Sequence, residues 1–561
     1  MEYCLISEKN NCKSCYKCIR NCPTKSISFS NNQASIIHDE CILCGRCYLA
    51  CPQGIKVIRD DISRAKELIR EKKKVIVSLA PSFLANYENV SFASLKEALK
   101  KLGFYDVEET AIGATIVKKS YDEILENNNR DIIITSCCHS INLLIEKHYP
   151  ELLPFLADTM SPMVAHGKDI KERNKDAYVV FIGPCIAKKD EADKYNKYID
   201  VALTFLELAK WFKEEGIVLT QEKTSIKIDK SKARLFPTTG GILNSMDCNS
   251  KEYNYLAIDG MENVLAALKN IKDGKIHKCF IEMSSCNGSC INGPAISPEK
   301  RAILSGYLFV HKAAGKEDFD VTNYKYKDIM QNYISLDSHV AIPSEEDIKE
   351  CLKEMGKTSK NKELNCGCCG YDTCREKAIA IINGKAVKEM CLPYLMEKAL
   401  SFSDNIVNNT PNGIMVLNEN LDVQLMNKAF CKIIGVNDSS IVVGKNVTTI
   451  LEPDLYSKTL CGLSTIRGNK EFLPEYNKYV EETIVYDEKF HIVISIMRDI
   501  TDKELEAQRK EELMQKSMDI ANKVIDKNMR SVQEIASLLG ETAAETKVAL
   551  TSLKDTFKDD K

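Results

Sequence analysis

The sequence lacks the features that would direct it to nucleic acid or to a membrane. Its 77 basic and 80 acidic side chains leave a net charge of −3, so no overall field attracts polyanions. No apolar run approaches the roughly 18 residues of a membrane span, and the start MEYCLISEKN has no basic-then-apolar signal pattern. We therefore expect a cytoplasmic chain with neither a nucleic-acid nor a membrane partner.

Cysteine is scarce only in the last part of the chain. Two of the 24 cysteines lie beyond residue 400, whereas nine fall within the first 51 residues. A cytoplasmic chain is kept reduced, so these thiols favour metal ligands or reactive groups over disulfides. The 561 residues suffice for roughly three to five domains. Length and composition therefore predict a multidomain metalloprotein, and the patterns along the chain predict α/β and α+β parts.

The first cysteine group repeats one spacing twice. CKSCYKCIRNCP (12–23) and CILCGRCYLACP (41–52) both read C-x2-C-x2-C-x3-C-P. Four soft thiolates in one short run favour a [4Fe–4S] cluster, and zinc is the less favoured alternative. The pattern resembles bacterial two-cluster ferredoxins, in which the fourth cysteine of each run binds the other cluster. Over residues 1–58 the resemblance implies one cluster on Cys12, Cys15, Cys18 and Cys51 and a second on Cys41, Cys44, Cys47 and Cys22.

The block 59–345 alternates short apolar strands with longer charged, helix-like stretches. The strands are expected at 75–80, 131–135, 178–183 and 255–259, which is typical of a parallel sheet covered by helices. Three cysteine groups follow such strands: Cys137 and Cys138 in TSCCHS, Cys185 in GPCIAKKDE, and Cys286 and Cys290 in EMSSCNGSCINGP. Because open α/β sheets build their sites at the carboxyl ends of strands, we expect thiolates to converge on another cluster. Isolated core cysteines are the alternative.

These three loops, in this order, resemble the signature loops of the [FeFe]-hydrogenases, and FPTTGG (236–241) resembles a segment between the second and third loops. The resemblance implies that the cubane of an H-cluster is held by Cys138, Cys185, Cys286 and Cys290. Cys290 would also bridge to a two-iron unit with CO, cyanide and a dithiolate bridge. Cys137 would pass protons to the bridgehead amine, and Lys188 would donate hydrogen bonds to a cyanide ligand. Of Lys188 and Lys189, we expect one to lie at the surface.

The chain departs from this family around the proposed cluster. Gly183 and Ser284 stand where methionines are common, and the first loop continues HSI in place of Pro-Gly-Trp. Lys118 and Lys119 stand near the expected proton-relay carboxylates, and Ala157 near a relay serine. Groups around a metal site tune its potential, and lysine relays protons poorly at neutral pH unless burial lowers its pKa. These differences favour slow turnover.

A third cysteine group lies at 366–391, within a domain expected over 346–396. Its spacings of two, four and sixteen residues join Cys366, Cys369, Cys374 and Cys391, and Gly370 permits a tight turn beside the metal. The pattern resembles the small [4Fe–4S] domain of electron-transfer proteins. Cys368 could replace one of the ligands, and zinc is a real alternative here.

Beyond this domain the composition changes. Residues 408–430 read as strand, turn, strand and helix, and 491–504 as a strand running into a helix. This resembles a PAS sensor domain over 397–503, a fold that holds haem, flavin or nothing, and no residue here favours a cofactor. The tail 504–561 has apolar residues near heptad spacing, with a break expected at Gly540. Such a helix pairs with a copy of itself in a homodimer, the alternative being a single helix packed on its own domain.

No histidine follows residue 491, so the tail has no phosphoacceptor histidine and any output must pass to a separate signalling protein of the kinase or phosphatase class.

Three functions compete. The first is a sensory hydrogenase that responds to H2 through the PAS domain and tail. The second is a turnover hydrogenase that exchanges electrons between H2 and a soluble ferredoxin-like carrier. The third is an iron–sulfur protein without a two-iron unit. The PAS domain and altered cluster surroundings favour the first, and Cys137, Lys188 and Cys290 argue against the third.

Overall fold

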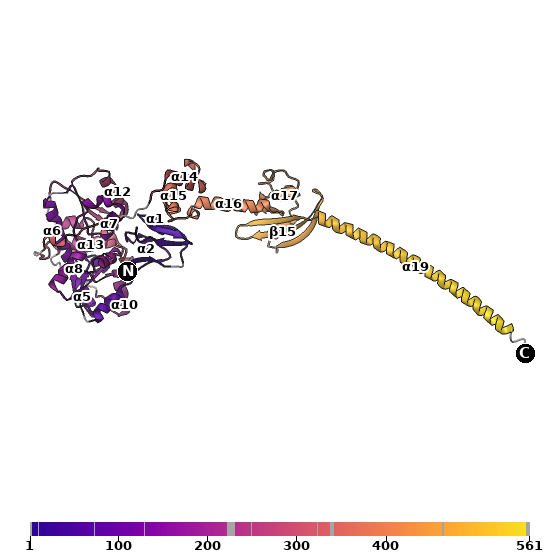
Figure 1. Ribbon diagram of the computed structural model, residues 1–561, viewed down its shortest axis with the longest axis horizontal. Coiled ribbons are helices and arrows are strands. Elements are labelled where there is room, and N and C mark those ends of the chain that lie inside the picture. Colours follow the sequence, from indigo (N-terminus) through magenta and orange to yellow (C-terminus); the bar gives the residue numbers. More distant parts are fainter. Residues whose placement is uncertain are drawn as a thin grey trace. The chain divides into compact units, whose positions relative to one another are not determined.

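The computed structural model divides into two units, Met1–Leu395 and Met396–Lys561. It describes residues 3–8, 11–71, 73–127, 130–220, 231–247, 250–321, 324–336, 341–462 and 465–556 (Figure 1). Among these residues, no helix is both long enough and apolar enough to cross a membrane.

The amino-terminal module repeats one small unit twice. Two antiparallel strand pairs form it, β1 (Leu5–Ser7) with β4 (Lys56–Ile58) and β2 (Ile27–Ser30) with β3 (Gln33–Ile36). The short helices α1 (Lys17–Asn21) and α2 (Arg46–Ala50) occupy matching places in the two cysteine runs and pack on each other. This packing brings the last cysteine of each run close to the other run.

Two parallel sheets form the central domain, where the sequence pattern indicated one. The first has the strand order β6-β5-β8-β9 and the second β10-β11-β7. The strands are β5 (Lys74–Leu79), β6 (Asp106–Glu109), β7 (Ile132–Ile134), β8 (Ala177–Gly183), β9 (Val201–Thr204), β10 (Asn254–Asp259) and β11 (Cys279–Ser284). Apolar runs predicted β5, β7, β8 and β10. The others were not predicted, and β6 (DVEE) shows why, since three of its four residues are acidic.

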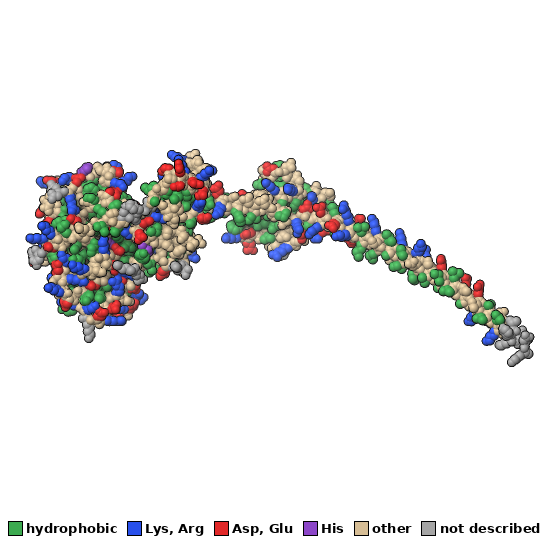
Figure 2. All heavy atoms as spheres, in the orientation of Figure 1, with side chains coloured by type: hydrophobic (Ala, Val, Ile, Leu, Met, Phe, Trp, Pro, Cys, Tyr) green, Lys and Arg blue, Asp and Glu red, His purple; other side chains and the backbone are tan. Residues whose placement is uncertain are grey.

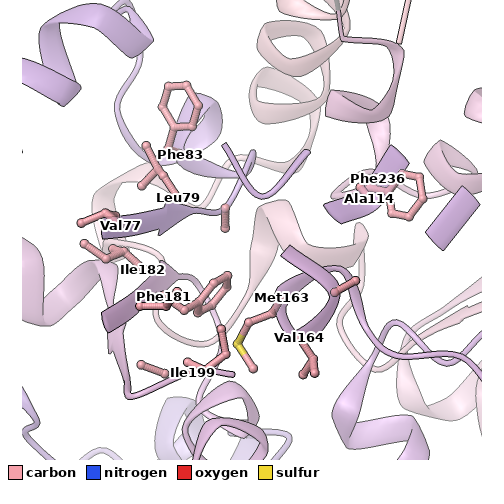
Figure 3. Close-up of a cluster of buried hydrophobic side chains, with 14 of the residues drawn as sticks. Val77, Leu79, Phe83, Ala114, Met163, Val164, Phe181, Ile182, Ile199 and Phe236 are labelled. Atoms are coloured by element: carbon pink, nitrogen blue, oxygen red, sulfur yellow. The ribbon is translucent and has the colours of Figure 1, made fainter. Parts of the chain in front are cut away.

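Helices cover these sheets and bury them. They are α3 (Ile62–Arg70), α4 (Phe83–Asn86), α5 (Phe92–Lys101), α6 (Ala111–Asn127), α7 (His139–His148), α8 (Pro162–Arg173), α9 (Ala187–Lys194), α10 (Phe205–Glu214), α11 (Gly241–Ser245), α12 (Met261–Lys272) and α13 (Ile303–Ala313). Figure 3 shows part of the core, where Val77 of β5 and Ile182 of β8 share one buried cluster with Met163 and Val164 of α8. Each such side chain contributes about 1.5–3 kcal/mol when fully buried. The strand ends that carry the cysteine loops are therefore firmly anchored.

A small domain follows the central one. Its helices α14 (Glu345–Glu354) and α15 (Cys374–Ile382) pack on each other around Ile348, Leu352 and Ala378. The next helix, α16 (Leu392–Asn409), begins directly after Cys391 and leads into the second unit.

The second unit contains a five-stranded antiparallel sheet in the order β13-β12-β16-β15-β14. Its strands are β12 (Gly413–Leu417), β13 (Val423–Met426), β14 (Ile466–Leu473), β15 (Lys478–Asp487) and β16 (Ile492–Asp499), and its helices α17 (Lys428–Ile433) and α18 (Asp454–Leu460). The predicted strand–turn–strand–helix at 408–430 is confirmed. In its turn, Asn418 Oδ1 accepts the backbone N–H groups of Asn420 and Asp422 at 2.9 and 2.8 Å.

The tail is one continuous helix, α19 (Thr501–Thr556), so the break expected at Gly540 is wrong. A glycine costs a helix interior only about 1 kcal/mol, and the leucine, alanine and glutamate residues around it are strong helix formers. The predicted heptad residues are exposed in the single chain, with Met518 54% and Ile525 57% accessible. Figure 2 shows these apolar side chains along the helix between charged ones.

Candidate functional site

The three central cysteine loops leave parallel strands of both sheets. Cys137 and Cys138 follow β7, and Cys286 and Cys290 follow β11, its neighbour in the three-stranded sheet. Cys185 lies between β8, in the four-stranded sheet, and α9. The site is therefore built where the carboxyl ends of two sheets meet, which places it on rigid elements.

Four of these sulfurs lie close together. Burial first, and then the neighbouring charges of Cys185 and Cys138, raise the pKa of Cys286 well above its usual range. The same two neighbours, after burial, raise the pKa of Cys290 to about 12. Thiols gathered at one place are stabilised as thiolates by a cationic metal centre. This donor set fits an iron–sulfur cluster held by Cys138, Cys185, Cys286 and Cys290.

Cys137 lies beside this group with a different partner. Its Sγ is 3.2 Å from the phenol oxygen of Tyr121 on α6, and burial raises the pKa of the thiol to about 12. The Tyr121 oxygen also accepts the backbone N–H of Ser136 at 3.0 Å. Ser136 Oγ in turn lies 2.8 Å from Thr159 Oγ1. Cys137 is thus a neutral thiol at the end of a buried chain of hydroxyl groups.

The lysines expected near a proton relay lie elsewhere. Lys118 is fully buried, and its ammonium pairs with Asp318 and, at 2.6 Å, with Asp247. The residue of α6 that contacts the Cys137 thiol is Tyr121, three positions after Lys118 and two after Lys119. Ala157 is also buried and offers only its backbone, whose N–H donates to the Ile134 carbonyl at 2.8 Å. A phenol, and neither a lysine nor a serine, therefore stands directly behind Cys137.

Lys188 is held inside the site. Its Nζ donates to the Cys137 carbonyl at 3.2 Å and pairs with the buried carboxylate of Glu191. Burial alone would lower the pKa of Lys188, but Glu191 holds it above its usual range. The ammonium is also close enough to Cys185 and Cys290 to lower the pKa of each against the effect of burial. Lys188 is therefore a fixed, charged donor at the edge of the thiol group.

Lys189 is buried as well, so the expectation that one of the two lysines lies at the surface is wrong. It is 1% accessible, and its Nζ pairs with Asp61 at 2.7 Å and with Glu207 at 2.8 Å. Two carboxylates offset the desolvation of this ammonium, which is how a lysine is accommodated in a core.

Methionines are common at two positions in the related family where this chain has Gly183 and Ser284. A Cβ added at Gly183 would lie 2.7 Å from the Phe181 ring and 3.2 Å from Ala80 Cβ, so the aromatic ring occupies that space. Ser284 is the last residue of β11, and its carbonyl accepts the Gly260 N–H at 3.1 Å. The glycine at 183 is thus part of the local packing.

Glu282 opens the third signature loop, EMSSCNGSCINGP, but the sequence analysis gave it no role. It is buried, and its carboxylate accepts the backbone N–H groups of Gly240, Ile242 and Leu243 at 2.9, 3.0 and 3.2 Å, which fixes the FPTTGG turn. Burial raises its pKa to about 7, and its charge contributes to the raised pKa of Cys137. The signal in the sequence is one carboxylate within the otherwise uncharged strand CFIEMS.

The amino-terminal cysteines gather in the crossed pattern. After burial, the charge of Cys22 contributes to the raised pKa values of Cys41 and Cys44, which places it with the second run. After burial, Cys51 and Cys12 contribute likewise to the raised pKa of Cys18. Cys47 lies near Cys22, Cys41 and Cys44, and Cys15 lies in the loop between Cys12 and Cys18.

The small domain brings its four predicted ligands around one cavity. Cys366, Cys369, Cys374 and Cys391 line it together with Tyr371 and Lys377. The Tyr371 hydroxyl is buried and has no hydrogen-bond partner among the described residues. Cys368 is exposed and lies outside this lining. Four thiols that line one cavity fit a bound cluster, and the cavity favours these four cysteines over a set that contains Cys368.

Four family models match the chain. Residues 4–64 match a 4Fe-4S dicluster domain, and residues 73–294 match the carboxyl-terminal domain of the iron only hydrogenase large subunit. Residues 363–393 match a putative Fe-S cluster domain, and residues 401–500 match the PAS fold.

Individual proteins are similar to the chain at low identity. The chain is 27% identical over 379 residues to iron hydrogenase 1 of Clostridium pasteurianum, covering 53% of this chain and 66% of that protein. It is also 27% identical to the cytosolic Fe-S cluster assembly factor NAR1 of Kluyveromyces lactis, over 31% of this chain and 40% of that one. A solved [FeFe]-hydrogenase HydA1 from Chlamydomonas reinhardtii aligns at 17% identity and a TM-score of 0.40, over 50% of this chain and all of that one.

Site and comparisons therefore agree on the class of the protein. The signature cysteines meet at the ends of the central strands, and the family models cover this domain, the iron–sulfur modules and the sensor fold. The chain is an [FeFe]-hydrogenase-like protein with a PAS domain.

Proposed function

We propose that this chain is a sensory [FeFe]-hydrogenase. It binds H2, slowly splits or forms it at an H-cluster, and passes the redox or conformational change through its PAS domain and tail to a separate signalling protein. The observation that carries the proposal is the meeting of four thiols with Lys188 and the Cys137 thiol in a chain that also contains a PAS domain. The chain spans 66% of the length of its Clostridium relative, whose activity is not transferred by similarity alone.

The residues around the site have distinct tasks. When bound, the H-cluster supplies the heterolytic cleavage of H2 into protons and electrons. Cys137 holds a proton at Sγ, because burial keeps it a thiol, and Tyr121 fixes the orientation of that sulfur. Lys188 offers an ammonium with three donors, which suits an anionic ligand of the metal. The remaining cysteine groups provide sites for three further [4Fe–4S] clusters that carry electrons.

A turnover hydrogenase is the second candidate, and the similarity to iron hydrogenase 1 favours it. The sensory function is supported by the PAS domain, by the long exposed helix α19, and by the different packing at Gly183. The similarity to NAR1 favours the third candidate, an iron–sulfur protein without a two-iron unit. These functions differ in the infrared spectrum, in H2 turnover and in whether H2 changes a partner's binding.

The experiment is infrared spectroscopy of the maturated full chain under H2, with a Cys290→Ser variant and a Cys279→Ala control at the opposite end of β11. We expect CO and cyanide bands in the wild type and the control, and their loss in Cys290→Ser. Absence of these bands from the wild type would contradict both hydrogenase functions. Bands combined with fast turnover, and with partner binding unchanged by H2, would favour the turnover enzyme.

The tail proposal needs its own test. We propose that α19 forms a homodimer through its exposed heptad stripe, which includes Met518 and Ile525. Ile525→Glu should convert a dimer to a monomer in sedimentation equilibrium, because a charge in the seam is desolvated. The control Lys527→Glu alters a residue two positions away, off the stripe, and should leave the dimer intact. A wild-type monomer at all concentrations would overturn this proposal.

A further inference from the structure

We propose that the small iron–sulfur domain is the electron sink of this chain. Its [4Fe–4S] cluster, held by Cys366, Cys369, Cys374 and Cys391, accepts one electron more readily than the amino-terminal clusters, and buried Lys377 gives it this property. For H2 as the electron donor the proposal rests on the proposed function. The property of Lys377 does not, since any one-electron reductant reveals it.

The small domain is docked on the amino-terminal module by specific contacts. The Phe29 N–H donates to the Lys385 carbonyl at 2.8 Å, and Lys385 Nζ pairs with Glu40 at 2.6 Å in a largely buried ion pair. Lys25 Nζ donates to the Gly370 carbonyl at 2.9 Å. These contacts join strand β2 and two residues beside the cysteine runs of the module to the cysteine loop of the small domain and to the segment after α15, which fixes their mutual orientation.

The docking brings cysteine loops together. A Cβ at Gly370 would lie 3.0 Å from Ile19 Cγ2 and 3.2 Å from the Arg20 backbone nitrogen, so the small domain's cysteine loop lies directly on α1. Arg20 Nη2 donates to the Cys368 carbonyl at 3.0 Å. Because α1 contains Cys18 and ends at Cys22, one ligand of each predicted amino-terminal cluster belongs to the helix that the small domain covers.

A second part of the module, next to Cys44, contacts the H-cluster loops. A Cβ at Gly45, next to Cys44, would lie 2.5 Å from Pro294 Cβ and 2.9 Å from Ile186 Cδ1. Ile186 follows Cys185, and Pro294 lies four residues after Cys290. The module therefore lies in contact with both the H-cluster loops and the small domain, and its clusters complete a route between them.

Lys377 distinguishes the end of this route. It is 1% accessible and lines the cavity of the four cysteines, and its Nζ donates to the Val387 carbonyl at 2.7 Å. Among the described residues it has no carboxylate in an ion pair. Its ammonium lies 5.5 Å from the ring centroid of Tyr371, whose buried hydroxyl has no hydrogen-bond partner among the described residues and lies near Cys369 and also near Cys22. A buried positive charge without a carboxylate in an ion pair and a free donor both stabilise the more negative, reduced form of a cluster.

The electron balance is simple. Oxidation of H2 releases two protons and two electrons. One electron converts the small-domain cluster from [4Fe–4S]2+ to [4Fe–4S]1+, and the other reduces a cluster of the amino-terminal module. Cys391 lies immediately before α16, and its carbonyl accepts the Leu395 N–H of the first turn at 2.9 Å. The electron thus comes to rest at the start of the helix that leads to the PAS domain.

The test is a redox titration of the full chain with reconstituted [4Fe–4S] clusters and a chemical reductant, followed by electron paramagnetic resonance. We expect the cluster that Cys374→Ala removes to be the first one reduced. Lys377→Met should lower its reduced-to-oxidised ratio at fixed potential at least tenfold, equivalent to about 59 mV for one electron. The other clusters should not change, and Lys377→Arg should restore the ratio. The control Lys388→Met alters a partly exposed lysine of the same domain that pairs with Glu354.

Several outcomes would overturn the proposal. A small-domain cluster reduced last, or a Lys377→Met titration that coincides with the wild type, would do so. If Lys377→Met fails to bind iron, Tyr371→Phe replaces it and should shift the same cluster in the same direction. An unchanged titration of that variant would also contradict the proposal. None of these measurements uses H2. The proposal for Lys377 can therefore be wrong while the proposed hydrogenase function is right, and the hydrogenase function can be wrong while the proposal for Lys377 is right.

Discussion

The central site and the small domain use the same parts in opposite electrostatic settings. Each gathers four thiols around one place and adds one buried lysine. At the central site Glu191 pairs with Lys188 and holds its pKa above the usual range. In the small domain Lys377 has a carbonyl partner in place of a carboxylate, and burial lowers its pKa to about 8. Lys188, whose charge is balanced by Glu191, acts by where it holds its hydrogen-bond donors, whereas Lys377, which has no carboxylate in an ion pair, acts through its charge.

The largest expected effect tests the central site by removing its proton-holding group. Cys137→Ala should reduce H2 turnover of the maturated chain at least about 100-fold, since positioned proton donors contribute roughly 10²–10⁴-fold. Its iron content should not change, because the four predicted cluster ligands remain. The measurement pairs methyl viologen reduction under H2 with an iron assay, and Cys4→Ala serves as a control at a buried thiol next to β1. Activity close to that of the wild type would show that the proton takes another route.

The next effect is on stability, at the compensated lysine. Lys188→Met leaves the Glu191 carboxylate buried and alone, which should cost about 3–5 kcal/mol of unfolding free energy. Removal of both charges in Lys188→Met/Glu191→Leu should recover most of that loss without restoring H2 turnover. Urea unfolding of the three proteins, followed by circular dichroism, measures the difference. If the double variant is as unstable as the single one, the pair is not the source of the effect.

A smaller effect concerns Glu282, a buried carboxylate with backbone partners only. Burial raises its pKa to about 7 from the usual 4.5, so the folded protein binds more protons than the unfolded chain between these values. The contribution of Glu282 to the unfolding free energy is fully present below pH 4.5 and is lost as the pH rises towards 7. The loss amounts to about 1.4 kcal/mol for each unit by which its pKa is raised. Glu282→Gln should remove this slope from the pH dependence of unfolding. A slope equal to that of the wild type would show that Glu282 is not its origin.

The smallest expected effect sharpens the comparison itself. Lys377→Met removes a buried charge that has no carboxylate in an ion pair among the described residues. The unfolding free energy of the cluster-free protein should therefore fall by at most about 1 kcal/mol, or increase. Measured beside Lys188→Met, it separates the two roles of a buried lysine. A loss as large as that of Lys188→Met would mean that Lys377 is a structural ion-pair partner.

The sequence predicted the cysteine groups but not their electrostatic partners. Spacing grouped the cysteines within each run, because those motifs are local, whereas the resemblance to the [FeFe]-hydrogenases selected the four thiols of the central site from three distant loops. Both Lys188 and Lys189 were harder to place, since their carboxylate partners come from α9 itself, from residue 61 and from α10. Tyr121 was missed because its contact with Cys137 depends on where α6 lies relative to the loop after β7, which no local pattern encodes. Short charged strands such as β6 were missed for a similar reason, since their partner strands supply the burial.

The unbroken helix α19 has a consequence for how a signal would travel along it. At 1.5 Å per residue its 56 residues extend for about 84 Å, and each added residue turns everything beyond it by about 100°. The output of such a rod depends on its rotational phase as well as on its length. A seven-residue insertion lengthens the helix by about 10 Å and nearly restores the original orientation of its far end. A two-residue insertion rotates the far end by about 200° about the helix axis.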